Sequence, residues 1–343
     1  MKTGPLCHIV PPHILRSLAE RGAERIRNCA WSTLTDSEQA RGQRRILMPI
    51  LSMAAVPTGT KRRTVYDAGH SYELPGRLVR GEGSRRTRDR AVNEAYDGSG
   101  ATWDFFNSVY NRNSIDGRGL RLDSTVHYGS DYDNAFWNGS QMVYGDGDGE
   151  IFGCFTRALD VIAHELTHGI TQSEAGLNYR GEAGALNESF SDVFGSLVKQ
   201  WKLGQTAEEA DWLIGGDLFL PGVAAKAIRS MKAPGTAYDD PLLGKDPQPA
   251  HMRDFVHTED DNGGVHINSG IPNRAFCETA LRIGGKAWEK PGAVWYRALT
   301  EGLGAGSSFR DAMNATVRAA ASLFGRNSRE QKAVREGWAK VGV

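Results

Sequence analysis

The sequence predicts an α+β protein with a β-rich N-terminal half and an α-helical C-terminal half. From Thr64 to about Phe155, short apolar runs are broken by Gly, Asn and Asp, which is typical of strands joined by turns. From Leu159 onward, apolar residues recur at helical spacing instead. The chain has 343 residues, which is long enough for two domains that each bury a core.

The individual elements follow from the same patterns. Residues 12–28 and 35–47 have apolar residues near helical spacing, and Pro49 ends the second pattern. Residues 48–64 combine small residues, two prolines and a basic tripeptide, which is typical of a linker that proteases can reach. One helix is expected within the β-rich half, near 87–110. The later helices are expected at 159–172, 185–203, 223–231, 270–284, 291–303, 307–323 and 328–338.

The charge distribution excludes some classes of protein. Lys and Arg total 41, as do Asp and Glu, so a protein built mainly to coat nucleic acid or an anionic membrane is not expected. The neutrality is a cancellation, because residues 1–95 hold 17 basic and 9 acidic residues while residues 96–343 hold 24 and 32. The basic start is interpreted as a solvated arm or as a segment that docks on the acidic remainder. Nucleic-acid binding is a weaker interpretation, since few aromatic residues interleave with the basic ones.

Targeting signals and disulfides are not expected. No run of about 18 apolar residues is present, so no membrane span is predicted. Pro11, Pro12 and His13 interrupt any apolar core of a secretory signal, so we expect a chain that is cytoplasmic as synthesised, with export by a signal-less route left open. The cysteines are too few and too scattered for a disulfide framework, and free thiols are expected at Cys7, Cys29, Cys154 and Cys277.

The strongest chemical signal is the segment HELTH at residues 164–168. On a helix, His164 and His168 share a face, so both imidazoles point at one site. Glu165 projects beside a metal held there and supplies a base for its water. The alternative is a core helix that contains two hydrogen-bonded histidines.

A catalytic zinc needs a third protein ligand and one open position. Glu188 follows His168 by 20 residues, which leaves room for a turn and a returning helix. Asp192 lies one helical turn further on, where a carboxylate can fix a ligand imidazole. Glu188 in isolation reads as a solvated surface acid, but its neighbours are the apolar residues Ala185, Leu186, Phe190 and Val193.

Together, HELTH and the segment GALNESFSD at 184–192 resemble the thermolysin family of zinc metallopeptidases. NAFWNG at 134–139 and MVYGDGDG at 142–149 agree with it, as do RSM at 229–231 and DNGGVHINSGIPN at 261–273. The resemblance covers residues from about 64 to 343. The segment PPHILR at 11–16, together with the missing signal peptide, resembles the protealysin-like subgroup, whose members carry a short propeptide.

The resemblance implies a two-domain fold with the active-site cleft between the domains. The β-rich domain would span 51–158, and the helical domain would span 159–343 and begin with the zinc-binding helix. Residues 1–50 would form a folded propeptide, rather than a disordered tail, with its boundary between 45 and 60. The implied activity is that of a latent zinc-dependent endopeptidase that acts on peptides or proteins and removes its own propeptide, which would be an intramolecular or intermolecular inhibitor.

The family also implies the roles of the metal-site residues. His164, His168 and Glu188 would bind one Zn²⁺, and Asp192 would support a ligand imidazole. Glu165 would take a proton from water and pass it to the leaving amine.

Further site residues are implied by the motif match alone. His266 and Tyr179 would stabilise the oxyanion, and Asp261 would orient His266. Without the resemblance, His266 reads as a polar loop residue, Tyr179 as a packing residue and Arg229 as a surface charge. The substrate backbone would be held by Asn134, Ala135 and Arg229. An apolar pocket for the residue after the scissile bond, which favours hydrophobic side chains, would be lined by Phe152, Phe155, Val161, Ile214 and Ile228. Many family members have a smaller aliphatic residue in place of Phe155, so this pocket is expected to be narrower.

Two features depart from the family pattern or add to it. Members often carry a paired calcium site, and Asp160 and Asp211 occupy two of its positions, but Lys199 occupies a third. An ammonium group cannot ligate Ca²⁺, so calcium is doubtful and Lys199 is expected to pair with the aspartates instead. Cys7 is interpreted as an inhibitory zinc ligand in the open position or as an incidental thiol.

Two competing functions remain at this point. One is a zinc-containing binding protein whose chemistry is lost, with the N-terminal segment as a permanent partner; the intact Glu165 and His266 weigh against it. The other is a zinc aminopeptidase. Pairing of a substrate strand with Asn134 and Ala135 favours binding along an extended chain, and hence internal cleavage.

Overall fold

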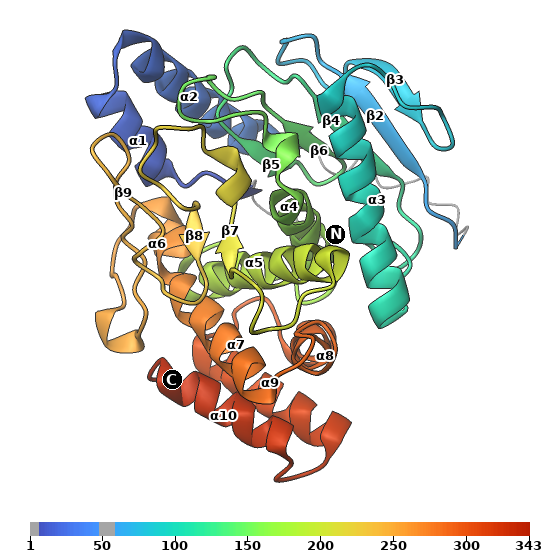
Figure 1. Cartoon of the computed structure of the whole chain (residues 1–343), viewed down its shortest axis with the longest axis vertical. Coiled ribbons are helices and arrows are strands. Elements are labelled where there is room, and N and C mark those ends of the chain that lie inside the picture. The colour runs from blue at the N-terminus through green and yellow to red at the C-terminus, as the bar shows by residue number, and fades with distance from the viewer. Residues whose placement is uncertain (1–6, 48–58) are drawn as a thin grey trace.

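The computed structural model of the chain describes residues 7–47 and 59–343. A six-stranded mixed sheet has the order β1-β5-β6-β4-β2-β3. Its strands are β1 (Cys7–His8), β2 (Arg63–Asp67), β3 (Arg77–Gly81), β4 (Leu122–Val126), β5 (Ala135–Trp137) and β6 (Met142–Tyr144). Figure 1 shows the sheet and α3 (Arg90–Tyr110) at one end of the molecule. The N-terminal strand β1 forms the edge of this sheet, beside β5.

Two long helices form the middle of the molecule. They are α4 (Leu159–Ser173) and α5 (Gly181–Leu203), which pack closely against each other. The other helices of this half lie beyond them (Figure 1) and comprise α6 (Asp261–Asn268), α7 (Gly270–Ile283), α8 (Lys290–Arg297), α9 (Phe309–Phe324) and α10 (Arg329–Lys340). A mixed α+β architecture with a helical second half, as the sequence predicted, is therefore confirmed.

The N-terminal region folds into two helices, α1 (Pro12–Arg21) and α2 (Glu24–Leu47), rather than the two predicted at 12–28 and 35–47. The break falls at Gly22, where a Cβ atom would lie 2.6 Å from Cγ2 of Ile26. The backbone at Gly22 is extended, with φ −68° and ψ 162°, so α1 ends there and α2 begins at Glu24. The apolar face of α1 is buried in the main core through Ile14, Leu15 and Leu18.

One predicted helix is wrong. Residues 223–231 form turns and the short strand β8 (Arg229–Ser230), which pairs antiparallel with β7 (Leu213–Ile214). The backbone N–H of Lys226 donates to Ala237 and that of Ile228 donates to Ile214. These tertiary partners take the backbone groups that a helix would have used, so local apolar spacing did not decide the structure.

The remaining segments are short. β9 (Asp239–Asp240) pairs with β10 (Gly244–Lys245), and α8 continues into a π-helical turn at Ala298–Gly302. Three 3₁₀ turns lie at Phe155–Arg157, Gly216–Leu218 and Met252–Asp254. Most of the predicted linker, residues 48–58, lies outside the described residues, and Arg63 and Thr64 already belong to β2. Within the described ranges, every helix is too short or too polar to cross a bilayer.

Candidate metal centre and active-site cleft

Helices α4 and α5 bring three metal-binding side chains together. His164 and His168 lie one turn apart on α4, and their Nε2 atoms are 3.0 Å apart. Glu188 of α5 places Oε2 3.5 Å from Nε2 of His164 and Oε1 3.5 Å from Nε2 of His168. All three side chains are buried. The helical spacing therefore places the two imidazoles together, as predicted, and the packing of α5 on α4 brings the carboxylate beside them.

This donor set fits a zinc ion. Tetrahedral ligands at ~2.0–2.1 Å from a zinc are separated from one another by about 3.3 Å. That value lies between the 3.0 Å that separates the two Nε2 atoms and the 3.5 Å from each of them to Glu188. Oε2 of Glu188 is buried without a hydrogen-bond partner, and a cation between these groups would supply one. Burial lowers the pKa of His168 to about 3, whereas Asp192 and Glu188 outweigh burial at His164 and raise its pKa to about 9. A bound cation would replace the proton of His164.

Polar side chains of α5 contact the Nδ1 atom of each imidazole. Nδ1 of His164 lies 2.8 Å from Oδ1 of Asp192. Nδ1 of His168 lies 2.8 Å from Oδ1 of Asn187 and 3.0 Å from Oγ of Ser191. Asp192 was expected in this position, whereas Asn187 and Ser191 were missed. Their spacing of four residues, beside Glu188, was the available signal.

Glu165 is positioned as a base. Its Oε2 accepts a hydrogen bond from the backbone N–H of Trp137 at 3.0 Å, which ties α4 to β5. Its Oε1 is buried without a hydrogen-bond partner. Burial raises the pKa of this carboxyl to about 8, which suits a group that must take up and return a proton near neutral pH.

His266 and Tyr179 both contact the Glu188 carboxylate of the metal centre. Nδ1 of His266 lies 2.7 Å from Oδ1 of Asp261, whose other oxygen accepts from the backbone N–H of His266 at 2.9 Å. Burial opposes protonation of His266, but Asp261 and Glu188 outweigh it and raise its pKa. Its Nε2 lies 3.2 Å from the hydroxyl of Tyr179, which also donates to Glu188. The structure thus brings together every residue expected for the oxyanion.

Arg229 is not a surface charge but a fully buried guanidinium. Its Nε and Nη2 each donate to Asp192 at 2.8 Å, in a two-pronged ion pair. Asn273 also donates to Asp192 at 2.8 Å, a contact that the sequence analysis missed. Asp192 therefore holds both His164 and Arg229, so one carboxylate couples the metal site to the substrate-binding side.

The chain's own N-terminal strand lies along β5, beside the metal centre. β1 runs antiparallel to β5, and the N–H of Ile9 donates to the carbonyl of Ala135 at 3.2 Å. Val10 exchanges two hydrogen bonds with the side chain of Asn134, at 2.9 and 3.3 Å. Nη1 of Arg229 donates to the carbonyl of Ile9 at 3.0 Å. Each expected substrate-backbone contact is thus occupied by residues of this strand.

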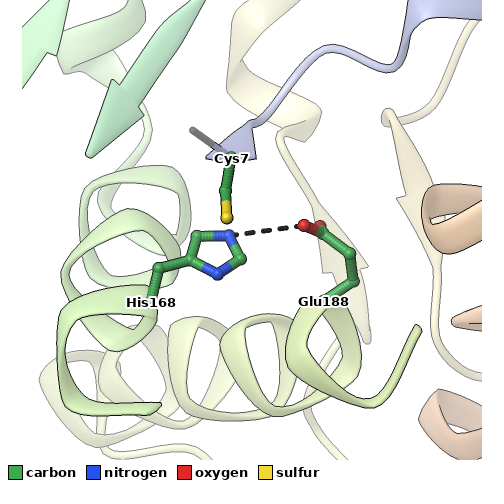
Figure 2. Close-up of side chains that lie close together, drawn as sticks. All are labelled: Cys7, His168 and Glu188. Carbon is green, nitrogen blue, oxygen red and sulfur yellow. Dashed lines mark ion pairs between the residues drawn. The ribbon is translucent and has the colours of Figure 1, made fainter. Parts of the chain in front are cut away.

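Cys7 points at the metal centre from this strand. Figure 2 shows its sulfur above the ring of His168, with Glu188 beside it. The sulfur, a nitrogen of His168 and an oxygen of Glu188 all lie within 4.8 Å of one another. Cys7 is also packed against Tyr179 and Val265, and only 4% of its surface is exposed. This placement favours the interpretation as a ligand over that of an incidental thiol.

The residues predicted to line the apolar pocket are buried, and Lys199 forms the expected ion pairs. Ile9 and the five predicted lining residues all belong to the main apolar core: Phe152, Phe155, Val161, Ile214 and Ile228. Nζ of Lys199 lies 3.2 Å from Oδ2 of Asp160 and 3.0 Å from Oδ2 of Asp211. The two carboxylates outweigh burial and raise the pKa of Lys199, so its ammonium stays charged.

A helix that carries HELTH, a glutamate from the next helix and a buried glutamate base define a zinc-dependent metallopeptidase. The chain belongs to the thermolysin family. Residues 55–172 match the model of the thermolysin metallopeptidase catalytic domain, and residues 175–343 match that of its α-helical domain. It is therefore a hydrolase that acts on peptide bonds, and the family implies a catalytic zinc.

Relatives of similar length match nearly the whole chain. An extracellular metalloprotease of Pectobacterium carotovorum subsp. carotovorum is 51% identical over 344 residues, covering 100% of this chain and 98% of that protein. Protease PrtS of Photorhabdus sp. (strain Az29) is 44% identical over 346 residues, covering 98% and 91%. The solved precursor of protealysin, a metalloproteinase from Serratia proteamaculans, superposes with a TM-score of 0.90 at 51% identity, covering 98% of this chain and 99% of that one.

Proposed function

We propose that this chain is the latent precursor of a zinc endopeptidase that removes its own N-terminal segment. Residues 1–50, with a boundary between 45 and 60, are the inhibitory propeptide. Residues 51–158 and 159–343 are the two catalytic domains, with the cleft between them. The main support is the strand at residues 7–10, which engages the groups that would otherwise bind a substrate. The likeness to a protealysin precursor along the same length agrees with this proposal.

The geometry of the site supports the catalytic roles that the family resemblance implies. A zinc ion held by His164, His168 and Glu188 would supply the Lewis acid of the reaction. Glu165 takes a proton from the attacking water and delivers it to the leaving amine, for which its raised pKa is suited. His266 and Tyr179 donate hydrogen bonds to the oxyanion that forms at the substrate carbonyl.

Binding of a substrate strand requires the remaining residues of the cleft. Asn134 and Ala135 pair with the substrate backbone, and Arg229 binds the carbonyl of the residue after the scissile bond. In this structure, Asn134 bonds to Val10, and both Ala135 and Arg229 bond to Ile9. An isoleucine buried at this position supports a preference for a hydrophobic residue after the scissile bond. Phe155, through its size, restricts how large that residue can be.

The position of the bound strand favours an endopeptidase over an aminopeptidase, and the contacts of the catalytic residues favour an enzyme over an inactive binding protein. Cys7 is paired with Trp137 on the N-terminal side of the catalytic groups, so the cleft accepts chain on both sides. An aminopeptidase closes that side to recognise a free amine, and this arrangement does not support it. Glu165 and His266 are both held in position, which weighs against a binding protein that has lost its chemistry.

Two further properties belong to the proposal. Lys199 replaces the paired calcium site by pairing with Asp160 and Asp211. The chain is made in the cytoplasm, and its secretion from the cell is also part of the proposal. The name of the Pectobacterium relative, an extracellular metalloprotease, supports secretion.

The test is self-processing of the purified chain at neutral pH. N-terminal sequencing is expected to find a new terminus between residues 45 and 60, together with hydrolysis of a peptide that has a hydrophobic residue after the cleaved bond. A zinc chelator and the Glu165→Ala substitution should each abolish both. If Glu165→Ala matures at the unaltered rate, the proposed chemistry is wrong.

A further inference from the structure

The N-terminal strand is bound in a definite register relative to the catalytic groups. Nε2 of His266, the oxyanion donor, lies 3.0 Å from the carbonyl oxygen of His8. The next residue, Ile9, donates its N–H to Ala135 and accepts from Arg229 through its carbonyl. The peptide bond flanked by these contacts joins His8 to Ile9. It therefore lies at the position where the site cleaves a substrate.

In this register, the His8–Ile9 bond needs protection from hydrolysis. A bound strand should be hydrolysed when water can reach the metal and the carbonyl carbon. The sulfur of Cys7 lies within 4.8 Å of the ligand atoms of His168 and Glu188, on the metal side of the strand. A thiolate is a strong zinc ligand and would take the open fourth position that water needs.

We propose that the His8–Ile9 bond is a bound substrate of this chain's own active site, and that Cys7 keeps it uncut by occupying the position of the attacking water. This inference rests on the proposed peptidase function and specifies how latency is maintained. When the sulfur is removed, water adds to the carbonyl carbon of His8 and the carbon–nitrogen bond to Ile9 breaks. Glu165 carries the proton to the nitrogen. The products are a peptide of residues 1–8 with a new carboxylate and a chain that begins with the amine of Ile9.

The first test uses the full-length Cys7→Ser precursor loaded with zinc. Mass spectrometry at early times, before any cut between 45 and 60, is expected to detect loss of residues 1–8 and a new terminus at Ile9. The rate should not change on about 100-fold dilution, because bond and site belong to one molecule. Cys29→Ser, which removes a different buried thiol, should keep the His8–Ile9 bond uncut at these times, as the wild type does. The double substitution of Cys7→Ser with Glu165→Ala should also stay intact.

A second readout does not depend on activity. Wild-type protein in which cobalt replaces zinc is expected to show sulfur-to-cobalt charge-transfer absorption, which Cys29→Ser keeps and Cys7→Ser loses. If the wild type lacks this absorption, the sulfur does not bind the metal and the inference fails. It also fails if a folded Cys7→Ser or Cys7→Ala protein with full metal content is not cut at His8–Ile9. In that case, peptide hydrolysis by the processed enzyme would leave the proposed function standing, whereas its absence would reject the proposed function as well.

Discussion

Lys199 offers a stability test of the calcium replacement. Asp160 is 1% exposed, and Lys199 and Asp211 surround it in one ion-pair cluster. Lys199→Met would leave the Asp160 carboxylate buried without its cation. Breaking a buried pair from one side costs about 3–5 kcal/mol, and Lys199 is partly exposed, so water can reach the site and the loss should be about 3 kcal/mol.

The sign of the pH dependence follows from the carboxyl group. Burial raises the pKa of Asp160 even with Lys199 present, and removing the cation raises it further. A carboxyl with a raised folded pKa destabilises the fold fully above that value; the penalty shrinks as pH falls below the folded pKa and disappears below the unfolded pKa. The loss caused by Lys199→Met should therefore be largest at neutral pH and should shrink on acidification.

The measurement is urea unfolding in a Glu165→Ala background, which prevents self-digestion. Lys202→Met is the matched control, because Lys202 is exposed on the same helix and its loss should change stability by less than about 0.5 kcal/mol. Added calcium should not raise the midpoint of the parent protein. Equal effects of the two substitutions, or a calcium-dependent midpoint, would refute the proposed role of Lys199.

Two further predictions concern the cleft. Asp192→Asn removes the charge that holds both His164 and Arg229, so zinc affinity in a chelator competition should fall by about 10–100-fold; unchanged affinity would contradict the coupling. His13 lies 2.9 Å from the hydroxyl of Tyr238, and burial lowers its pKa to about 4. Protonation therefore favours release of α1 from the rest of the chain. The opening of α1 in the Glu165→Ala background, measured by hydrogen exchange and corrected for the intrinsic base-catalysed rate, should rise as pH falls from 6.5 toward 4. A His13→Gln variant that shows the same rise would rule out His13 as the cause.

The parts of the site that were predictable from local patterns are those whose geometry is local. His164 and His168 had to share a face once their segment was helical, and Glu188 was recognisable by its apolar neighbours on the following helix. Tyr179, Arg229 and His266 could be named only through the family resemblance. They lie on separate segments, and nothing in their own neighbourhoods distinguishes them from packing or surface residues.

The sequence by itself determined the α+β class, the metal-binding helix and the chemistry that its side chains can supply, because helical periodicity and ligand type are properties of short segments. Only the tertiary structure decided that residues 223–231 become turns and a strand, since their backbone groups bond to Ile214 and Ala237 instead of to one another. It likewise decided that Asn187, Ser191 and Asn273 support the site. The register that places His8–Ile9 at the catalytic groups depends on hydrogen bonds between residues more than 100 positions apart, which no local pattern encodes.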